Sequence, residues 1–450
     1  MALNESNNLR DLPRPPLDKG WPFLGHALSL ANNFGGFIKD KYLEHGPIFR
    51  LRAANQELVI MAGVEANLFA NRKGKEYFRS KEFWQKHDDE FGATRSLISE
   101  DGPYHAKMRG LQKRAYSRGN ATKHFDTIIN IAREQIRAWP IDEPIIVQSA
   151  LQRLVTEQLG IIAANYAPKE NLDHIIRFVR TNLAVNISRQ RPQFLLNLPQ
   201  YQKAKEQTLD MGRKIIEIHK QESTDRHIDL VDNMLVAAQE DPEFIPEHDQ
   251  LLFVLGPYVA GLDTAASTTA FMMYALLTHP DILDRVINEC DSLMAAGIPD
   301  PKAFRSLDVT ARAFQETLRL YPIAPAMTRT ATQDFEFQGY LVQKGDQVVV
   351  GTTVPHQLPQ FYPNPDRFDI DRYLPDRKEN KKPGVFAPFG IGAHTCLGAG
   401  FAEILINLNM AVLLTTVDLE MVDPHYNLKV DPIPTPSPDK NFKIRVIKHR

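Results

Sequence analysis

The sequence predicts one large domain that is mainly α-helical and carries a minor β region. Short stretches with the pattern of strands cluster early and late in the chain, whereas apolar residues from about residue 82 to residue 321 recur mostly at helical spacing. No low-complexity tract, Ser/Gly run or internal repeat divides the 450 residues. We therefore expect a single domain over residues 1–450, with residues 1–20 as an extended N-terminal segment.

The predicted strands are short. Residues 48–52 and 57–61 alternate or run apolar on either side of residues 53–55, which is typical of a β-hairpin. Turn residues separate three further stretches, and a last one alternates near the end of the chain; these are residues 335–337, 340–342, 347–350 and 442–447. The pattern predicts small sheets beside a helical core.

The composition excludes some classes of function. Lys plus Arg number 53 against 55 Asp plus Glu, so the chain lacks the basic surface of nucleic-acid-binding proteins. Two cysteines give no disulfide framework, which is consistent with a reducing compartment. Residues 1–14 lack the apolar stretch of a signal peptide, and we find no run of about 20 apolar residues that would span a membrane. We expect a cytoplasmic monomer without a membrane span, although removal of an N-terminal anchor stays open.

Cys396 is the residue most indicative of chemistry, because it lies among glycines and just before a long apolar helical pattern at residues 397–414. Gly390, Gly392 and Gly398 remove side-chain bulk and would let a flat ligand approach the backbone. The start of a helix favours the thiolate form of cysteine, which binds iron. The alternative is a structural cysteine, since free cysteines are often buried.

The run of Phe389, Gly392, Cys396 and Gly398 resembles the haem-ligand signature of the cytochrome P450 family. The likeness extends from a proline-rich segment near the N-terminus to the C-terminal strand. It implies the triangular, mostly α fold of that family, and haem b (iron protoporphyrin IX) as the cofactor. It also implies that Cys396 binds the iron and that Phe389 and Gly390 lie beside the cofactor.

Residues 251–277 form a long apolar helical pattern that contains Gly261, Asp263 and Thr264. A glycine in mid-helix costs about 1 kcal/mol relative to alanine, so we expect Gly261 to allow close approach of a ligand or local loosening. Thr264 can direct its hydroxyl to a carbonyl one turn earlier. Asp263 and Thr264 resemble the acid–alcohol pair of the family, which implies proton delivery. The alternative is that both belong to an ordinary helix face, and Pro257 should kink the helix.

Glu316 and Arg319 lie three residues apart on a predicted helix and share a face. They match the Glu-x-x-Arg motif of the family, and Arg367, which lies between Asp366 and Phe368, matches its second arginine. The resemblance implies a buried cluster of three charges that stabilises the loop presenting the cysteine. The alternative is an exposed helical pair worth a few tenths of a kcal/mol.

Four cations match the residues with which the family binds the haem propionates. His105 and Arg109 lie four residues apart and so on one side of a predicted helix, while Arg329 and His394 come from later segments. Arginine suits this role because its planar fork binds carboxylates bidentately. The alternative for each is a surface arginine or a core histidine.

The substrate pocket is expected to be apolar, which favours a lipophilic substrate. We expect six residues to face it: Tyr258, Val259, Ala260, Ile323, Ala324 and Ala326. Residues 194–198 could form part of a mobile roof. Ordinary core packing explains each of these residues about as well.

The chain contains no flavin or nicotinamide fingerprint and no set of iron–sulfur cysteines. The resemblance therefore implies a separate electron donor, a ferredoxin or flavodoxin with its own reductase. Such donors are usually acidic, so a basic surface would attract them. The candidates are Lys107, Lys113, Arg114, Arg118, Arg377, Lys378, Lys381 and Lys382, although a mixed solvated surface explains them nearly as well.

The motifs and the resemblance together predict a monooxygenase that inserts one atom of O2 into a lipophilic small molecule, a hydroxylation. A haem-thiolate peroxygenase or isomerase is the alternative within haem chemistry, although such enzymes usually lack the acid–Thr pair. A non-catalytic haem sensor or binding protein would keep Cys396 but would not need proton delivery. The sequence does not choose among fatty acids, terpenoids, steroids and aromatic compounds as substrates.

Overall fold

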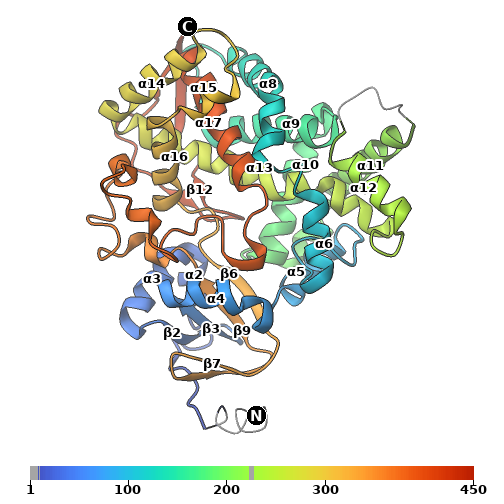
Figure 1. Ribbon diagram of the computed structural model, residues 1–450, viewed down its shortest axis with the longest axis vertical. Coiled ribbons are helices and arrows are strands. Elements are labelled where there is room, and N and C mark those ends of the chain that lie inside the picture. Colours follow the sequence, from blue (N-terminus) through green and yellow to red (C-terminus); the bar gives the residue numbers. More distant parts are fainter. Residues whose placement is uncertain (1–8, 10, 222–227) are drawn as a thin grey trace. The chain divides into compact units, whose positions relative to one another are not determined.

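The computed structural model describes residues 9, 11–221 and 228–450 (Figure 1). Most of the first half of the expected extended segment, residues 1–8 and 10, therefore lies outside the described residues. The chain divides into two compact units, each assembled from three stretches of sequence. The β-rich unit comprises Met1–Gln85, Leu97–Ala106 and Ala324–Cys396, and the helical unit comprises Lys86–Ser96, Lys107–Ile323 and Leu397–Arg450.

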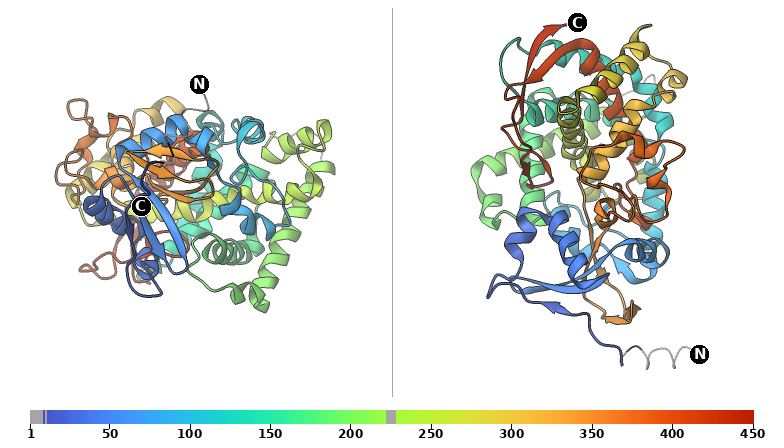
Figure 2. Two further views of the ribbon diagram at one scale, coloured as in Figure 1. Left: turned by 90° about the horizontal axis from the view of Figure 1, so that it is seen from below. Right: turned by 90° about the vertical axis from the view of Figure 1, so that its left-hand side faces the viewer.

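The β-rich unit contains a six-stranded sheet in the order β1-β2-β3-β9-β6-β4. Its strands are β1 Leu17–Asp18, β2 Ile48–Ala53, β3 Gln56–Ala62, β9 Gln347–Gly351, β6 Met327–Ala331 and β4 Phe78–Arg79. The antiparallel pairing of β2 with β3 confirms the predicted hairpin, and β3 pairs in parallel with β9 from much later in the chain (Figure 2). The sequence did not predict β1, β4 or β6.

Two of the predicted short strands, β7 Phe335–Phe337 and β8 Tyr340–Val342, pair with each other in a second hairpin, which was not predicted. Its turn residues Gln338 and Gly339 have φ angles of 54° and 81°. Two successive positive φ angles are typical of the type I′ turn, whose twist matches that of the strands. Glycine adopts this conformation without a steric penalty.

Both faces of the main sheet are buried, because β3 and β9 point apolar side chains to each side in alternation. The helices of this unit are α2 Ala27–Asn32, α3 Phe34–His45 and α4 Val64–Tyr77. Val350 of β9 belongs to a core cluster with Ala70 of α4. Val349, the next residue along, belongs to another cluster with Ile38 of α3. Burial on both faces explains the apolar runs at residues 58–62 of β3 and 348–350 of β9.

The helical unit is dominated by α13, which confirms the predicted long apolar helix. The helices of this unit are α7 Arg118–Ala121, α8 Phe125–Arg137, α9 Val147–Ala164, α10 Leu172–Asn182, α11 Pro199–Gln221, α12 Leu230–Glu240, α13 Glu247–Leu277, α14 Pro280–Met294, α15 Pro301–Arg305, α16 Val309–Leu320 and α17 Ala399–Thr416. Two further helices, α5 Lys81–Asp89 and α6 Gly102–Gln112, contain residues of both units. α13 packs against α9 and α17, among other helices, and continues on both sides of Pro257. A helix in contact with neighbours around most of its circumference is apolar all round.

Two small sheets complete the helical unit. β10 Val417–Met421, β13 Lys443–His449 and β5 Ile145–Ile146 form one of them, and β11 Val430–Asp431 pairs with β12 Ser437–Pro438 in the other. The last predicted strand, residues 442–447, corresponds to β13.

Our expectation that no stretch is apolar enough to cross a membrane was wrong. By length and composition, Glu247–Leu277 and Gly392–Thr416 both meet that requirement. However, 72% and 67% of their most apolar windows are buried inside the protein. Core helices of globular proteins have the same properties, so these two helices are weak evidence for a membrane span.

Candidate functional site

Cys396 is exposed and ends a compact loop just before α17. Its backbone N–H donates to the carbonyl oxygen of Phe389 over 2.8 Å, and the hydroxyl of Thr395 donates to that of Gly392 over 2.8 Å. α17 begins at Ala399 instead of the predicted residue 397. The thiol therefore lies just before the first helical turn, where the partial positive charge of the helix favours a thiolate.

The backbone of this loop requires two of its glycines. Gly390 and Gly392 have φ angles of 72° and 77°, which are unfavourable for residues with a side chain. A Cβ atom on Gly392 would also lie 2.9 Å from the carbonyl oxygen of Ala70 in α4. Conformation and packing therefore account for the glycine pattern that the sequence displays.

Three of the four predicted propionate-binding cations come together around Asp101, which the sequence analysis missed. Nε2 of His394 lies 2.8 Å from Oδ1 of Asp101, and the ring of His394 stacks on that of His105 with centroids 4.2 Å apart. The backbone N–H of Ser80 donates to Oδ2 of Asp101 over 2.7 Å. Arg329 is close enough for its charge to interact with that of Asp101. A single carboxylate thus organises this cluster in the β-rich unit.

The surroundings in this cluster shift the pKa values of two of its residues, Asp101 and Arg329. Burial raises the pKa of the Asp101 carboxyl, but hydrogen bonds from His394 and from the N–H of Ser80 outweigh that effect, so the pKa lies below its ordinary value. Burial lowers the pKa of Arg329 to about 10, and the charge of Asp101 offsets this only in part. At neutral pH the site therefore holds an ionised Asp101 and a cationic Arg329.

The surroundings of Arg329 fit the carboxylate of a ligand. The residue is only 9% exposed, and its Nη1 donates to the carbonyl oxygen of Thr328 over 2.7 Å. Within the described ranges of the chain, its guanidinium forms no ion pair closer than 4 Å. A buried guanidinium without an ion pair is costly, so an added carboxylate would stabilise it. The haem propionate expected here meets that requirement. Arg109 is half-buried and lies one turn after His105 on α6, as its spacing predicted.

Thr264 lies on the least buried face of α13. Its hydroxyl donates to the carbonyl oxygen of Ala260 over 2.7 Å, which confirms the predicted hydrogen bond to the preceding turn. Gly256, Ala260 and Thr264 follow one another at four-residue spacing, and each is less buried than most of the helix. This face therefore combines small side chains with one hydroxyl.

Gly261 has a packing role that the sequence analysis did not foresee. A Cβ atom at this position would lie 2.8 Å from Cδ1 of Leu159 in α9. The helix is unbroken here, so the expected loosening does not occur. Glycine allows α9 and α13 to pack closely.

Asp263 is buried and directed toward α9 and α10. Its Oδ1 accepts hydrogen bonds from Nε2 of Gln152 over 2.6 Å and from Nη1 of Arg180 over 2.7 Å. Its Oδ2 has no hydrogen-bond partner in the part of the chain that the structure describes. The side chain of Arg180 is 24% exposed, so the ion pair connects a buried carboxylate with solvent. Neither Gln152 nor Arg180 was identified from the sequence.

Glu316 and Arg319 form a doubly hydrogen-bonded ion pair on α16. Nε and Nη2 of Arg319 lie 2.8 Å from Oε2 and Oε1 of Glu316, respectively. Both side chains are fully buried, so the alternative of an exposed pair is wrong.

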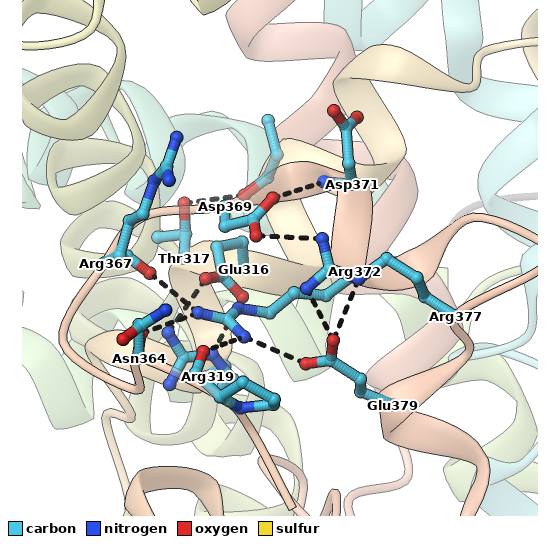
Figure 3. A network of polar contacts seen from close by, with 12 residues as sticks. Glu316, Thr317, Arg319, Asn364, Arg367, Asp369, Asp371, Arg372, Arg377 and Glu379 are labelled. Atoms are coloured by element: carbon cyan, nitrogen blue, oxygen red, sulfur yellow. Dashed lines mark hydrogen bonds and ion pairs between the residues drawn. The ribbon is translucent and has the colours of Figure 1, made fainter. Parts of the chain in front are cut away.

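The arginine that we expected to join this pair, Arg367, is exposed, and that prediction is wrong. The buried arginine of the segment is Arg372, whose side chain is 0% exposed. It donates to Oε2 of Glu379 over 2.9 Å and to the carbonyl oxygens of Pro363 and Asn364 over 2.7 and 2.8 Å. The carbonyl of Arg367 also accepts from Arg372, while the Arg367 side chain points away from it (Figure 3). The backbone therefore wraps around Arg372 and leaves the side chain of Arg367 outside.

The six predicted pocket residues do not share one environment. Tyr258 is buried, and a Cβ atom on Gly160 of α9 would lie 2.5 Å from its hydroxyl oxygen. Tyr258 is therefore a core residue packed on α9, and its assignment to the pocket is wrong. The others differ in exposure: Ala260 and Ala324 are exposed, Val259 and Ala326 are half-buried, and Ile323 is buried. The expected roof contains a short helix, Gln193–Asn197, beside which Leu198 is exposed.

Several basic residues that were expected to attract an electron donor are engaged within the protein. These ion pairs join Lys107 with Asp241, Arg118 with Glu403, and Arg377 with Asp369 and Glu379. Lys113 and Arg114, in contrast, are exposed neighbours that follow α6. Lys378 and Lys381 are exposed too, and none of these four residues forms an ion pair with the residues that the structure describes, so all four are the better candidates for a docking surface.

Comparison with known proteins identifies the family. Residues 15–442 match the model of the cytochrome P450 family. The chain is 26% identical over 449 residues to a putative cytochrome P450 120 of Synechocystis sp., which covers 99% of both chains. It is 25% identical to the abscisic acid 8'-hydroxylase CYP707A1 of Solanum lycopersicum, covering 96% of this chain and 91% of the relative. It is 27% identical to a sterol 14alpha-demethylase of Mycolicibacterium vanbaalenii, covering 89% and 90%.

Solved structures share the fold. The heme domain of cytochrome P450DA has a TM-score of 0.85 and 23% identity, and covers 98% of both chains. The retinoic acid bound cyanobacterial CYP120A1 has a TM-score of 0.84 and 24% identity, and covers 98% of this chain and 100% of that one. The predicted fold, mainly α with a minor β region, is confirmed. Since the family match spans nearly the whole chain, the protein belongs to the cytochrome P450 family and is a haem-iron monooxygenase.

Proposed function

We propose that this protein hydroxylates a lipophilic small molecule of isoprenoid type, with haem b held through Cys396. The observation that carries the proposal is the buried carboxylate of Asp263, which directly precedes Thr264 and is ion-paired with the partly exposed Arg180. Hydroxylation with O2 requires positioned proton donors. A sensor or a binding protein has no such requirement.

The cofactor would be held by residues whose chemistry suits each of its parts. The Cys396 thiolate would bind the iron, with Phe389 and Gly390 beside it in the loop. Arg329, His394, His105 and Arg109 would bind the propionates, and the incompletely compensated charge of Arg329 supports this assignment. Haem bound in this way supplies the iron on which O2 is activated.

The protein would supply the protons through α13. Oδ2 of Asp263 has no partner among the described residues, so it is the oxygen that takes up and releases a proton. Arg180 holds the other oxygen and connects the carboxylate with solvent. The Thr264 hydroxyl donates to Ala260, which leaves its oxygen lone pairs to accept a hydrogen bond.

The names of the relatives support the substrate class. Two of them name abscisic acid and sterols, and one solved structure names retinoic acid. All three are isoprenoid compounds with largely apolar skeletons. The small residues along the exposed face of α13, Gly256 and Ala260, leave space for a bulky apolar molecule.

Electrons would come from a ferredoxin or flavodoxin with its own reductase, because the sequence contains no flavin or nicotinamide fingerprint. The exposed Lys113 and Arg114 would contribute to docking. The protein would act as a cytoplasmic monomer. Its two units would work as one cytochrome P450 domain, since the family match spans both.

The proposal is tested by screening isoprenoid acids, sterols and fatty acids for a shift in the spin state of the haem spectrum. Compounds that shift it are then incubated with O2, a ferredoxin system and reductant, and the products are analysed by mass spectrometry. We expect a product with one added oxygen atom from at least one isoprenoid compound. Turnover only with added peroxide, or only with fatty acids, would contradict the proposal.

A further inference from the structure

Two buried glutamines of α9 donate hydrogen bonds to α13, the helix against which α9 packs (Figure 1). Nε2 of Gln148 donates to the hydroxyl oxygen of Ser267 over 3.0 Å, and Nε2 of Gln152 donates to Oδ1 of Asp263 over 2.6 Å. The two donors are four residues apart, as are the two acceptors, so the contacts lie one helical turn from each other. All four side chains are buried. Of the two contacts, only that of Gln152 reaches the acid of the proposed proton supply.

Arg180 of α10 does not bind the Asp263 carboxylate with both arms of its guanidinium group. Nη1 donates to Oδ1 over 2.7 Å, whereas Nη2 donates to the carbonyl oxygen of Ile433, between β11 and β12, over 2.8 Å. Ion pairs of arginine with a carboxylate are frequently bidentate, with two parallel hydrogen bonds. Here the backbone at Ile433 takes the second arm.

Both side-chain donors therefore converge on one oxygen of the carboxylate. Oδ1 of Asp263 accepts from Gln152 and from Arg180, while Oδ2 is buried and has no hydrogen-bond partner among the residues that the structure describes. Each carboxylate oxygen has lone pairs of its own, and buried polar atoms are normally hydrogen-bonded. The uneven distribution leaves Oδ2 open to exchange a proton.

Compensation of a buried charge is the competing explanation for the contact of Gln152 with Asp263. It accounts for the presence of two donors, because a buried carboxylate needs hydrogen bonds. It does not account for their convergence, since an unsatisfied buried acceptor is costly and donors divided between the two oxygens would avoid that cost. The convergence is therefore the observation that calls for a further role of Gln152.

We propose that Gln152 is a positioning residue for the proton supply, which holds Oδ1 of Asp263 and thereby keeps Oδ2 open. The inference rests on the proposed role of Asp263 in hydroxylation. Without the amide, Nη2 of Arg180 should leave the carbonyl oxygen of Ile433 and bind Oδ2, because a bidentate bond between opposite charges is stronger than one to a neutral carbonyl. Both oxygens of the carboxylate would then be engaged, and proton exchange would slow.

The crystal structure of Gln152→Met tests the geometry without any turnover. Methionine has a similar size and donates no hydrogen bond. We expect Nη1 and Nη2 of Arg180 to lie within about 3.2 Å of Oδ1 and Oδ2 of Asp263 in this variant. Gln148→Met is the matched control, because it removes the equivalent buried contact between the same two helices and should leave Arg180 unchanged. An Arg180 that keeps its wild-type contacts in Gln152→Met would overturn the proposal.

Turnover of the haem-loaded, full-length protein tests the consequence, with the first isoprenoid compound that yields a product in the screen above. In Gln152→Met we expect kcat to fall by about tenfold at an unchanged KM, and the ratio of rates in H2O and D2O to rise. Gln148→Met should keep the wild-type values. Equal losses in the two variants would show that both glutamines only hold the helices together. If Gln152→Met does not fold, Gln152→Asn replaces it in both experiments, since its shorter side chain does not reach Asp263.

A double-mutant cycle separates this inference from the proposed function. If Gln152 acts through the carboxylate, adding Gln152→Met to Asp263→Asn should cause no further loss of kcat. Losses that multiply would overturn the positioning role and leave the role of Asp263 intact. Wild-type turnover in Asp263→Asn alone would contradict the proposed proton supply, and the inference with it.

Discussion

Nη1 of Arg180 lies 2.7 Å from Oδ1 of Asp263 and connects α10 with the middle of α13. The same carboxylate oxygen accepts from Gln152 of α9, so three helices share one buried anion. Burying a carboxylate in this apolar environment is costly unless such partners hydrogen-bond to it. The arrangement makes Asp263 the residue on which the proposed proton supply depends.

Replacing the Asp263 carboxylate should slow product formation while leaving the protein folded. We expect Asp263→Asn to reduce product formation by about 10²-fold, because an amide does not relay protons as a carboxylate does. Steady-state rates with a saturating electron donor measure the effect. Asp173→Asn is the matched control, since it breaks an exposed ion pair with Arg153 between α10 and α9, two of the three helices that share the Asp263 carboxylate. Wild-type turnover in Asp263→Asn would exclude the proposed role.

Removing the Thr264 hydroxyl should uncouple reductant consumption from product formation rather than stop reductant consumption. In Thr264→Ala we expect reductant consumption to continue while product per reductant falls by about tenfold and peroxide is released instead. Parallel assays of reductant, peroxide and product provide the measurement. Thr269→Ala loses a similar hydrogen bond, to the carbonyl oxygen of Ala265, and should remain coupled. Equal coupling in the two variants would contradict the assignment of Thr264.

Arg372, and not Arg367, should be the stabilising arginine before the cysteine loop. We expect Arg372→Ala to lower the free energy of unfolding by about 3 kcal/mol, because a fully buried guanidinium is removed, Glu379 keeps only Arg377, and the carbonyl groups of the enclosing backbone lose their donor. The exposed Arg367→Ala should change it by less than about 0.5 kcal/mol. Urea unfolding and haem retention measure both. A larger loss of stability in Arg367→Ala than in Arg372→Ala would instead support the prediction from the sequence, in which Arg367 joins the buried ion pair.

The carboxylate of Asp101 should contribute stability that depends on pH in a defined direction. Its pKa is lower in the folded protein than the ordinary 3.8. The contribution is therefore complete above 3.8 and is lost as the pH falls from there through the pKa of the folded state. Asp101→Asn should be less stable than the wild type at neutral pH, and the difference should shrink below pH 3.8.

Urea unfolding at a series of pH values tests this relationship. Asp40→Asn is the control, because Asp40 is exposed in the same unit and, among the residues that the structure describes, forms an ion pair only with its neighbour Lys39, over 3.5 Å. A difference between wild type and Asp101→Asn that is as large in acid as at neutral pH would show that the ionised form contributes nothing.

The sequence predicted those parts of the site that depend on local patterns. The positions of the cysteine loop and Thr264, and the ion pair of Glu316 with Arg319, follow from spacing within a few residues. Asp101 and Arg180 were missed because their partners lie 293 and 83 residues away in the chain. Nothing local to either residue indicates such a partner.

Two errors have their own physical causes. Asp366-Arg367-Phe368 and Asp371-Arg372-Tyr373 have the same pattern of an acid, an arginine and an aromatic residue. Sequence alone does not reveal which arginine the backbone encloses. Tyr258 was misplaced because α13 is apolar on every side, so hydrophobic periodicity does not indicate which face is the more exposed.

The absorption spectrum of the reduced, carbon-monoxide-bound protein tests the central claim most directly. Cys290 is the natural control, because it is the other cysteine of the chain, is buried, and has its pKa raised by burial to about 12. We predict the long-wavelength Soret band of a thiolate-ligated haem in the wild type and in Cys290→Ala, and its loss in Cys396→Ser. An unchanged band in Cys396→Ser, or its loss in Cys290→Ala alone, would contradict the account.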